Sequence, residues 1–387
     1  MRVMIYTIFY PAPPEMHTRV DTMVVHYFAK ALQDKGHQVQ VVHMNCDNLP
    51  TLWKNRFQGI IPKEAEYEYD GIPVHLFKIT TLIPFQGNPQ RFQAAFINRS
   101  LKALKRRLGW KPDKVFVHFP TLFTGVTEIF ADNVPVLGDF HNIDIRILDK
   151  RYLNQGQNAK IEAFVRQLDH WGYRNIRIKA RLERIESHSM VRDFSGIEYS
   201  ILAGEDFIRE KLRRGSGTMR ILYAGQLIPL KNVDVLIHAV QHLSFDWQFT
   251  IVGGGPEEAR LKAMAGDDPR IYFTGKLTRQ ETVKRMKEAD VFIMLSSPET
   301  YGLVYLESMA QGCINIASRG EGFDGIITEG VEGFLANPGS VEAAVETLER
   351  VHAMPRDVRE QMILNSYRLA ASMTEDQTAQ RFLEANV

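Results

Sequence analysis

The sequence predicts an α/β protein made of two doubly wound, Rossmann-like domains. Strand-like and helix-like segments alternate through both halves of the 387 residues, a length sufficient for two domains. Composition changes near 203–218, where "AGEDFIREKLRRGSGT" has the Gly/Ser and charge content of a linker. We therefore expect an N-terminal domain over 1–203 and a C-terminal domain over 204–365, facing each other across a cleft. A C-terminal helix over 366–387 is expected to pack back on the first domain.

The N-terminal half begins with a strand over 3–10 and a Pro-rich loop. A helix over 21–36 follows, with Gly36 as its C-cap. Further strands are expected at 37–44, 114–119 and 134–141, a hairpin at 66–79 turning at Asp70-Gly71, and a basic helix at about 89–108. The apolar side chains placed on one face of the first helix are Val24, Tyr27, Phe28, Ala31 and Leu32.

The C-terminal half repeats a strand–helix unit. Repeated units of this kind imply a parallel, doubly wound sheet. The expected strands are 219–227, 247–256, 270–275, 290–297, 314–318 and 332–337, and the expected helices are 232–243, 257–266, 278–289 and 302–312.

Composition limits the function classes. With 44% hydrophobic and 24% charged residues the chain reads as globular, and no stretch approaches the roughly 20 apolar residues of a membrane span. The two cysteines, Cys46 and Cys313, favour a reduced cytoplasmic protein without disulfides. Residues 1–200 hold 27 Lys/Arg against 20 Asp/Glu (+7), and the remainder holds 20 against 26 (−6). This asymmetry suggests that one face meets something anionic.

In open parallel sheets, ligands bind beyond the carboxyl ends of the strands. Four loops of the second half occupy that edge: 225–232, 253–256, 275–281 and 297–302. Glu299 precedes a helix that begins near Gly302, and Glu307 lies within it. Free amides at about Tyr301, Gly302 and Leu303 suit a phosphate, and a carboxylate on either side could bind hydroxyls. That layout matches the hexose, diphosphate and ribose of a nucleotide sugar.

The second half resembles the GT4-type retaining glycosyltransferases of the GT-B fold. The resembling stretches are "YAGQLIPLKN", "IVGGGPEEARL", "YFTGKLTRQE", "ETYGLVYLE" and "GFDGIITEGVEGFLANP", which span about 220–340 in the family's order. The resemblance implies that Glu299 faces the donor sugar, that Glu307 binds the ribose, and that Lys231 binds the diphosphate. The alternatives for the glutamates are a solvated loop residue for Glu299 and a carboxylate near a helix N-terminus for Glu307.

Further donor contacts are implied at Gly254, Lys276 and Thr300. His141, after the strand at 134–141, would lie near the reacting face of the donor sugar, and its alternative is a structural histidine. Gln226 departs from the family, because an arginine is usual at that position. Position 230, which is also often arginine in relatives, is Leu230 here. A neutral amide binds phosphate more weakly than a cation. Arg319 or Arg146 could supply the missing charge.

A second departure lies in the N-terminal loop. Relatives often have a Gly-Gly pair there, whereas this chain has His17, Thr18 and Arg19. These residues could contact the diphosphate in place of the missing arginine, or they could reshape the acceptor site.

The segment 91–111 is basic and amphipathic. It fits the surface of an anionic membrane, and equally a domain helix with a solvated outer face. Nucleic acid is disfavoured, because no recognition motif accompanies the charge.

The resemblance implies transfer of a hexose or N-acetylhexosamine, with retention, to a hydroxyl of a glycan or polyprenyl-linked acceptor. UDP is favoured over GDP, and surface-polysaccharide synthesis at the inner face of the membrane is the expected setting. No cofactor and no metal is expected, since the cleft loops show no Asp-x-Asp pair and no His cluster. The alternatives are a sugar-nucleotide epimerase of GT-B fold and a non-catalytic nucleotide-sugar-binding subunit. A glycan phosphorylase is disfavoured by the short chain.

Overall fold

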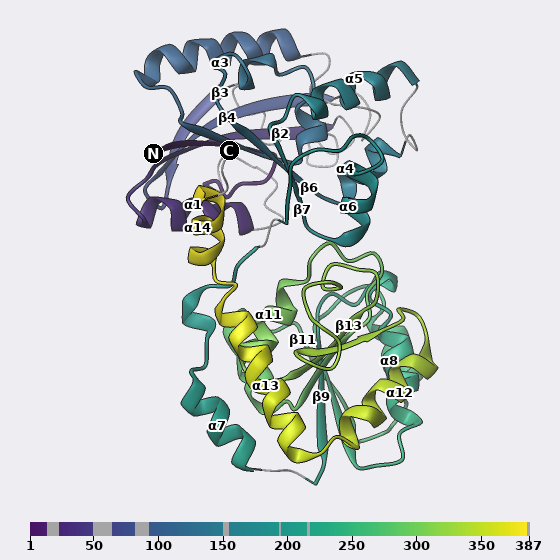
Figure 1. Ribbon diagram of the computed structural model, residues 1–387. Helices are drawn as coiled ribbons and strands as arrows, with labels where there is room; N and C mark the ends of the chain where they lie inside the picture. Colours follow the sequence, from purple (N-terminus) through teal and green to yellow (C-terminus); the bar gives the residue numbers. More distant parts are fainter. Residues whose placement is uncertain are drawn as a thin grey trace. The chain divides into compact units, whose positions relative to one another are not determined.

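In the computed structural model the chain forms two α/β units, each built on its own sheet (Figure 1). The structure describes residues 1–13, 23–48, 64–81, 93–149, 155–192, 195–214 and 217–384. The first unit comprises Met1–Arg174, Ile178–Phe194 and Thr378–Val387, and the second comprises Asn175–Arg177 and Ser195–Gln377. The predicted class, α/β with two Rossmann-like units, is confirmed.

The sheet of the first unit has the order β3-β4-β2-β1-β5-β6-β7-β8 within the described ranges. Neighbouring strands are parallel except β3 and β4. The strands are β1 (Arg2–Thr7), β2 (Gln38–Asn48), β3 (Glu64–Tyr69), β4 (Ile72–Thr81), β5 (Lys114–His118), β6 (Val136–Phe140), β7 (His170–Tyr173) and β8 (Met190–Arg192). The helices are α1 (Val24–Asp34), α3 (Ala94–Leu108), α4 (Asn142–Leu148), α5 (Gln155–Arg166), α6 (Ile176–Leu182) and α14 (Glu375–Glu384).

Two local features test the sequence reasoning in this unit. The β3–β4 hairpin turns at Asp70 and Gly71, with φ of 51° and 76°, as a two-residue turn requires, so that prediction is confirmed. The buried face of α1 was predicted in part. Ala31 and Leu32 are buried as expected and Phe28 packs against the core, but Val25, His26 and Ala29 are buried where Val24 and Tyr27 were expected. Burial of His26 is satisfied by Tyr10, whose hydroxyl lies 3.0 Å from the Nδ1 atom of His26.

The strands β7 and β8 were not predicted. They have four and three residues, which is too short for a period-2 pattern to stand out in the sequence.

The C-terminal helix α14 belongs largely to the first unit, where it lies beside α1 (Figure 1). The ring of Phe382 packs edge-on against Phe28 and Phe116, at centroid distances of 5.3 Å and 5.7 Å. Lys114 donates to the carbonyl of Leu383 at 2.7 Å. A cation at the C-terminal end of a helix is favourable because unpaired carbonyls gather there.

The sheet of the second unit is fully parallel, in the order β11-β10-β9-β12-β13-β14. Its strands are β9 (Met219–Ala224), β10 (Trp247–Val252), β11 (Ile271–Gly275), β12 (Val291–Met294), β13 (Ile314–Ser318) and β14 (Gly333–Ala336). Its helices are α7 (Glu205–Arg214), α8 (Val233–Gln241), α9 (Glu258–Ala265), α10 (Arg279–Glu288), α11 (Leu303–Met309), α12 (Val341–His352) and α13 (Arg356–Ala371). Each predicted strand and helix of this half is present.

The segment 203–218 is not simply a linker, which corrects the sequence prediction. It contains helix α7, in which Ile208 is fully buried. Lys211 of the same helix donates to the carbonyls of Gln311 at 2.8 Å and Met286 at 3.3 Å. These contacts make α7 part of the second unit, and the unit already includes Ser195.

The strand order places a topological switch in each sheet. In the first unit the chain winds outward on either side of β1 and β5, and in the second on either side of β9 and β12. Loops leaving such neighbouring strands diverge, so the carboxyl ends of the strands are where ligands bind in this class. Among the described residues, no helix is both long and apolar enough to cross a membrane.

Candidate functional site

A cleft of about 540 Å³ lies at the carboxyl edge of the second sheet. Its walls come from the loops that follow β9, β10 and β11 and from one face of α11. The lining residues include Gln226, Gly254, Lys276, Arg279 and Glu307. Four of these five were expected from the sequence, and Arg279 was not.

Lys231 sits in the short 3-10 turn between β9 and α8. Two contacts fix this turn to the loop after β12: the amide of Ser297 donates to the carbonyl of Leu230 at 2.9 Å, and the side-chain amide of Asn232 donates to the carbonyl of Leu295 at 2.7 Å. Lys231 Nζ thereby reaches Glu299 Oε2 at 2.7 Å. The structure thus brings together two residues that are 68 positions apart.

Glu299 is held by several donors besides Lys231. The hydroxyl of Ser296 donates to its Oε2 at 2.9 Å, and the amide of Thr300 donates to its Oε1 at 3.1 Å. Both carboxylate oxygens therefore accept hydrogen bonds, and an acceptor of this kind suits a binding group better than a proton donor.

Glu321, in the loop after β13, holds the Glu299 loop in place by hydrogen bonds. Only 1% of Glu321 is exposed. It accepts from the hydroxyl of Ser297 at 2.7 Å and from the amide of Glu299 at 2.9 Å, and Arg177 pairs with it at 2.7 Å. Sequence reasoning missed Glu321; the available signal was a carboxylate between two glycines directly after a predicted strand.

Glu307 lies inside α11, as predicted, and faces the cleft. Arg279, at the start of α10, donates from Nε to Glu307 Oε1 at 2.8 Å, and its Nη2 lies 2.8 Å from the same oxygen. The other end of the guanidinium contacts Glu198. Burial raises the pKa of the Glu307 carboxyl, and Arg279 opposes that rise in part.

Gly302 stands between the two glutamates, directly before α11, with a φ of 85°. A Cβ there would lie 2.6 Å from the ring of Tyr305, so both backbone and space require glycine. The neighbouring Tyr301 is buried, and its ring packs edge-on to Phe323 at 5.9 Å. Tyr301 can therefore serve a ligand through its backbone only, while Leu303 begins the helix.

The glycines after β10 divide into two kinds. A Cβ on Gly253 would lie 1.8 Å from the carbonyl oxygen of Gly225, and one on Gly255 would lie 2.4 Å from that of Leu227. These two glycines are needed for the packing of one loop on another. Gly254 has nothing nearer than 3.5 Å and lines the cleft, so it is the one with room for a ligand.

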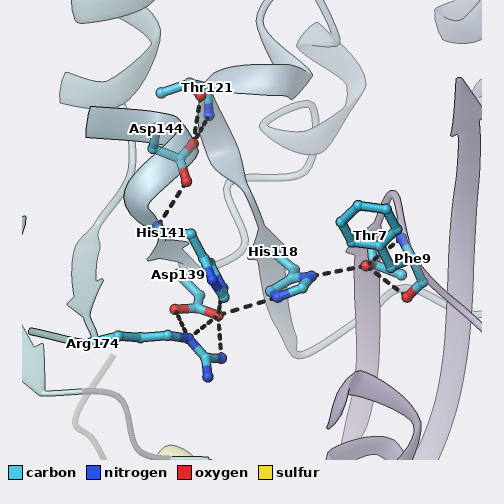
Figure 2. A network of polar contacts seen from close by, with 8 residues as sticks. All are labelled: Thr7, Phe9, His118, Thr121, Asp139, His141, Asp144 and Arg174. Carbon is cyan, nitrogen blue, oxygen red and sulfur yellow. Dashed lines mark hydrogen bonds and ion pairs between the residues drawn. The ribbon is translucent and has the colours of Figure 1, made fainter. Parts of the chain in front are cut away.

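His141, in the first unit, belongs to a buried polar network at the ends of β1, β5 and β6 (Figure 2). Asp139 is fully buried and receives Arg174 Nη2 at 2.6 Å and His141 Nε2 at 2.9 Å. Burial opposes the ionisation of Asp139, but Arg174 and His141 outweigh it and hold the pKa of Asp139 well below its usual value. Because Asp139 accepts from Nε2, the neutral ring of His141 keeps Nδ1 as an acceptor.

His118 lies between Thr7 and Asp139. Its Nδ1 atom is 3.0 Å from the hydroxyl oxygen of Thr7, and that hydroxyl also contacts the backbone of Phe9 (Figure 2). Burial lowers the pKa of His118 well below its usual value. His118 is therefore neutral.

One ligand atom from each of His118, Asp139 and His141 lies within 4.8 Å of the others. This corrects the expectation that the sequence places no histidine cluster among the strand-end loops. Asp139 is already engaged by Arg174, which would also repel a cation. The arrangement therefore suits a hydrogen-bonded network that orients His141 better than a metal centre.

Other expected residues fall into three groups. His17, Thr18 and Arg19 lie outside the described residues. Gln226 is exposed in the cleft, as is Lys276. Arg319, one substitute for the missing cation, donates to Glu329 at 2.7 Å and to the carbonyl of Leu335 and is not among the cleft-lining residues.

Two sheet-based units, the second with a cleft at its carboxyl edge, place the chain in the GT-B fold class. The solved structure of a sucrose-phosphate synthase from Thermosynechococcus elongatus superposes with a TM-score of 0.71 at 16% identity, covering 99% of this chain and 97% of that one. Anabaena HepE in complex with UDP-glucose gives 0.65 at 15% identity, covering 99% and 98%.

The family follows from sequence. The model described as "Glycosyl transferases group 1" matches residues 204–369, and "Glycosyltransferase Family 4" matches residues 22–178. The chain belongs to the GT4-type glycosyltransferases. Sulfoquinovosyl transferase SQD2 of Arabidopsis thaliana is 34% identical over 143 residues, which are 36% of this chain and 28% of that protein. The matches with the first curated relatives span less than half of each relative's length.

Proposed function

We propose that the chain transfers a hexose or N-acetylhexosamine from a nucleoside-diphosphate sugar to a hydroxyl of a glycan or lipid-linked acceptor, with retention at the anomeric carbon. The observation that carries the proposal is the arrangement around Gly302. Glu307, within α11, lines a cleft of about 540 Å³, and the Lys231–Glu299 pair lies before the same helix, beyond the residues that line the cleft. A cleft of this size fits a small organic ligand. UDP is the favoured nucleotide, and the fold neighbour solved with UDP-glucose supports that choice.

In the proposed reaction the bond between the anomeric carbon and the diphosphate breaks while a bond to the acceptor oxygen forms on the same face. The acceptor proton passes to the leaving phosphate oxygen. Lys231 would stabilise the charge that develops on the diphosphate. Glu299 would hold the sugar hydroxyls, and Glu307 those of the ribose. Both act by positioning the donor.

His141 is proposed to lie near the reacting face of the donor sugar, with its ring oriented by Asp139. Lys276, Thr300 and the backbone at Gly254 are proposed as further donor contacts. The proposal includes no resident cofactor and no metal.

The cellular setting proposed is cytoplasmic, in the synthesis of a surface polysaccharide. Attachment to a membrane through α3 receives little support from the structure. Ile97, Leu101 and Leu104 of that helix are buried in the core of the first unit. Lys102 pairs with Glu128 at 3.0 Å, and Arg107 pairs with Glu66 at 2.6 Å. An apolar face already used for packing is not free to enter lipid.

A donor panel with and without acceptors tests the proposal. UDP-hexoses, UDP-N-acetylhexosamines and GDP-mannose are incubated with the protein, alone and with glycan or polyprenyl-linked acceptors, and nucleotide release is followed. Release that depends on acceptor supports the transferase. A new sugar nucleotide formed without acceptor would instead show an epimerase, and tight binding without turnover of any donor would show a non-catalytic subunit.

Glu307→Ala supplies the second arm of the test. Its donor binding should be lost, because the ribose hydroxyls lose their acceptor. Glu288→Ala is the matched control, since Glu288 lies on α10 and only pairs with Arg285 at the surface. Unchanged donor affinity in Glu307→Ala would contradict the role assigned to Glu307.

A further inference from the structure

Arg279 occupies a position that the resemblance to the family does not predict. It is the first residue of α10, its side chain lines the cleft, and its guanidinium lies between Glu307 and Glu198. Both contacts to Glu307 go to the single oxygen Oε1. The Nε and Nη2 atoms of Arg279 therefore both bind Oε1 of Glu307.

The charges around this contact are mainly negative. Glu307 faces Arg279 from α11, Glu198 faces it from the segment before α7, and Glu375 at the start of α14 acts on the same group of charges. Burial, with Glu198, raises the pKa of Glu375 to about 8. Lys276 is the other cationic residue among those that line the cleft. Without Arg279, the Glu307 carboxylate would be half-enclosed among like charges.

A purely structural ion pair explains the arrangement less well. The Arg279 side chain is 37% exposed, and a pair at that exposure contributes little to stability. Glu307 is the more enclosed partner, at 15%. A carboxylate enclosed to this degree regains from a fixed cation part of what it loses in hydration. The effect of Arg279 is therefore on the state and direction of Glu307 more than on folding.

We propose that Arg279, itself held by Glu198, is a positioning residue that fixes the carboxylate of Glu307 for the ribose hydroxyls of the donor nucleotide. This inference rests on the proposed function, because it takes Glu307 as the ribose acceptor. It assigns Arg279 to the ribose and not to the diphosphate. The cation missing at Gln226 is therefore not replaced by Arg279.

The test compares the binding of UDP and 2′-deoxy-UDP by calorimetry at pH 6.0 and pH 8.0. The wild-type protein should prefer UDP. Arg279→Met should reduce that preference by roughly tenfold, the value of one charge-assisted hydrogen bond, and Arg279→Lys should retain part of it. Glu198→Gln should also reduce the preference for UDP over 2′-deoxy-UDP, but by a smaller factor. Arg285→Met, which alters an exposed arginine of the same helix, is the matched control and should behave as wild type.

The pH arm separates positioning from simple loss of a contact. In Arg279→Met the pKa of Glu307 should rise further, so UDP should bind more weakly at pH 6.0 than at pH 8.0 by a larger factor than in wild type. Titration of the UDP phosphate is common to both proteins and cancels in that ratio. Titration of Glu375 does not cancel, because Arg279 lowers its pKa, so both proteins are compared in a Glu375→Gln background. In a Glu307→Gln background the substitution at Arg279 should change neither the ratio nor the preference.

Three results would overturn the inference. The preference could be unchanged in Arg279→Met, or affinity for both nucleotides could fall equally, which would assign Arg279 to the phosphates. The pH ratio could also match wild type while only thermal stability falls. Failure of the proposed function is distinguishable, because it would appear in the donor panel as the absence of acceptor-dependent nucleotide release, whatever the preference between UDP and 2′-deoxy-UDP.

Discussion

Replacing Glu321 by glutamine should both destabilise the second unit and displace Glu299. Three donors converge on the two oxygens of this buried carboxylate: the hydroxyl of Ser297 and Nη1 of Arg177 at Oε1, and the amide of Glu299 at Oε2. A glutamine side chain has one oxygen and one NH2 group, so at least one donor must face another donor. If the amide nitrogen takes the place of Oε2, the backbone of Glu299 loses its partner.

The size of the effect follows from the burial of the site. A hydrogen bond to a charged group contributes about 1.5–3 kcal/mol, and a buried donor left without an acceptor costs about 1–3 kcal/mol. Because glutamine keeps one oxygen in place, we expect a loss of about 2 kcal/mol. Glu329→Gln is the control: Glu329 joins Arg319 and Arg350 at the surface, where removing an ion pair costs about 0–1 kcal/mol.

The assay combines urea unfolding of both variants with competition between UDP and UDP-glucose. Since Glu299 is assigned to the sugar, Glu321→Gln should weaken the binding of UDP-glucose by roughly tenfold while leaving the affinity for UDP nearly unchanged. Wild-type unfolding together with wild-type affinity for UDP-glucose would refute the view that Glu321 supports the Glu299 loop. A stability loss with unchanged sugar binding would refute the positional part alone.

Three further outcomes are expected. Gln226→Arg should tighten UDP binding by roughly tenfold in low salt and by less in high salt, measured by calorimetry at two ionic strengths, because an exposed cation in the cleft is screened by salt; no gain at low salt would contradict a shortage of positive charge there. Burial raises the pKa of the Asp144 carboxyl to about 7, so its bound proton stabilises the fold fully at a pH below 3.8, the pKa in the unfolded chain, and this stabilisation is lost as the pH rises to about 7. In Asp144→Asn the urea midpoint should therefore depend less on pH across this range. An equal pH dependence in both proteins would count against this assignment. Gly302→Ala should lower the free energy of unfolding by about 1–3 kcal/mol more than Gly339→Ala, which is the cost of overpacking. Both glycines have positive φ, but only a Cβ at Gly302 would clash with a side chain, that of Tyr305.

The sequence predicted best those features that depend on local periodicity. Glu307 was placed inside a helix and Glu299 before it, because the apolar pattern of 302–312 sets where the helix begins. The parallel arrangement of the second sheet follows from repeated strand–helix units in the same way, whereas its strand order was not predicted. The α1 face was predicted correctly at Ala31 and Leu32, but His26 was missed because the periodicity treats it as polar, whereas Tyr10 makes its burial possible.

The sequence did not predict contacts between loops that follow different strands. Glu321, Arg279 and Glu198 reach the site from three segments whose separation in sequence carries no period. In the sequence, Arg279 at the start of a predicted helix cannot be told apart from an ordinary surface arginine. The topological switch brings such loops to one edge, but which of their side chains meet depends on backbone geometry that residue spacing does not encode.

The two glutamates on either side of Gly302 share one electrostatic arrangement, in which each is paired with a cation. Lys231 neutralises Glu299, and Arg279 neutralises Glu307. Under the proposed function a diphosphate would compete with Glu299 for Lys231, and the carboxylate it releases would need hydrogen-bond donors. The hydroxyls of the donor sugar supply them, whereas a nucleoside diphosphate without its sugar does not. Phosphate and sugar recognition would then be coupled through one ion pair, while ribose recognition would stay independent, because Glu198 holds Arg279 in place.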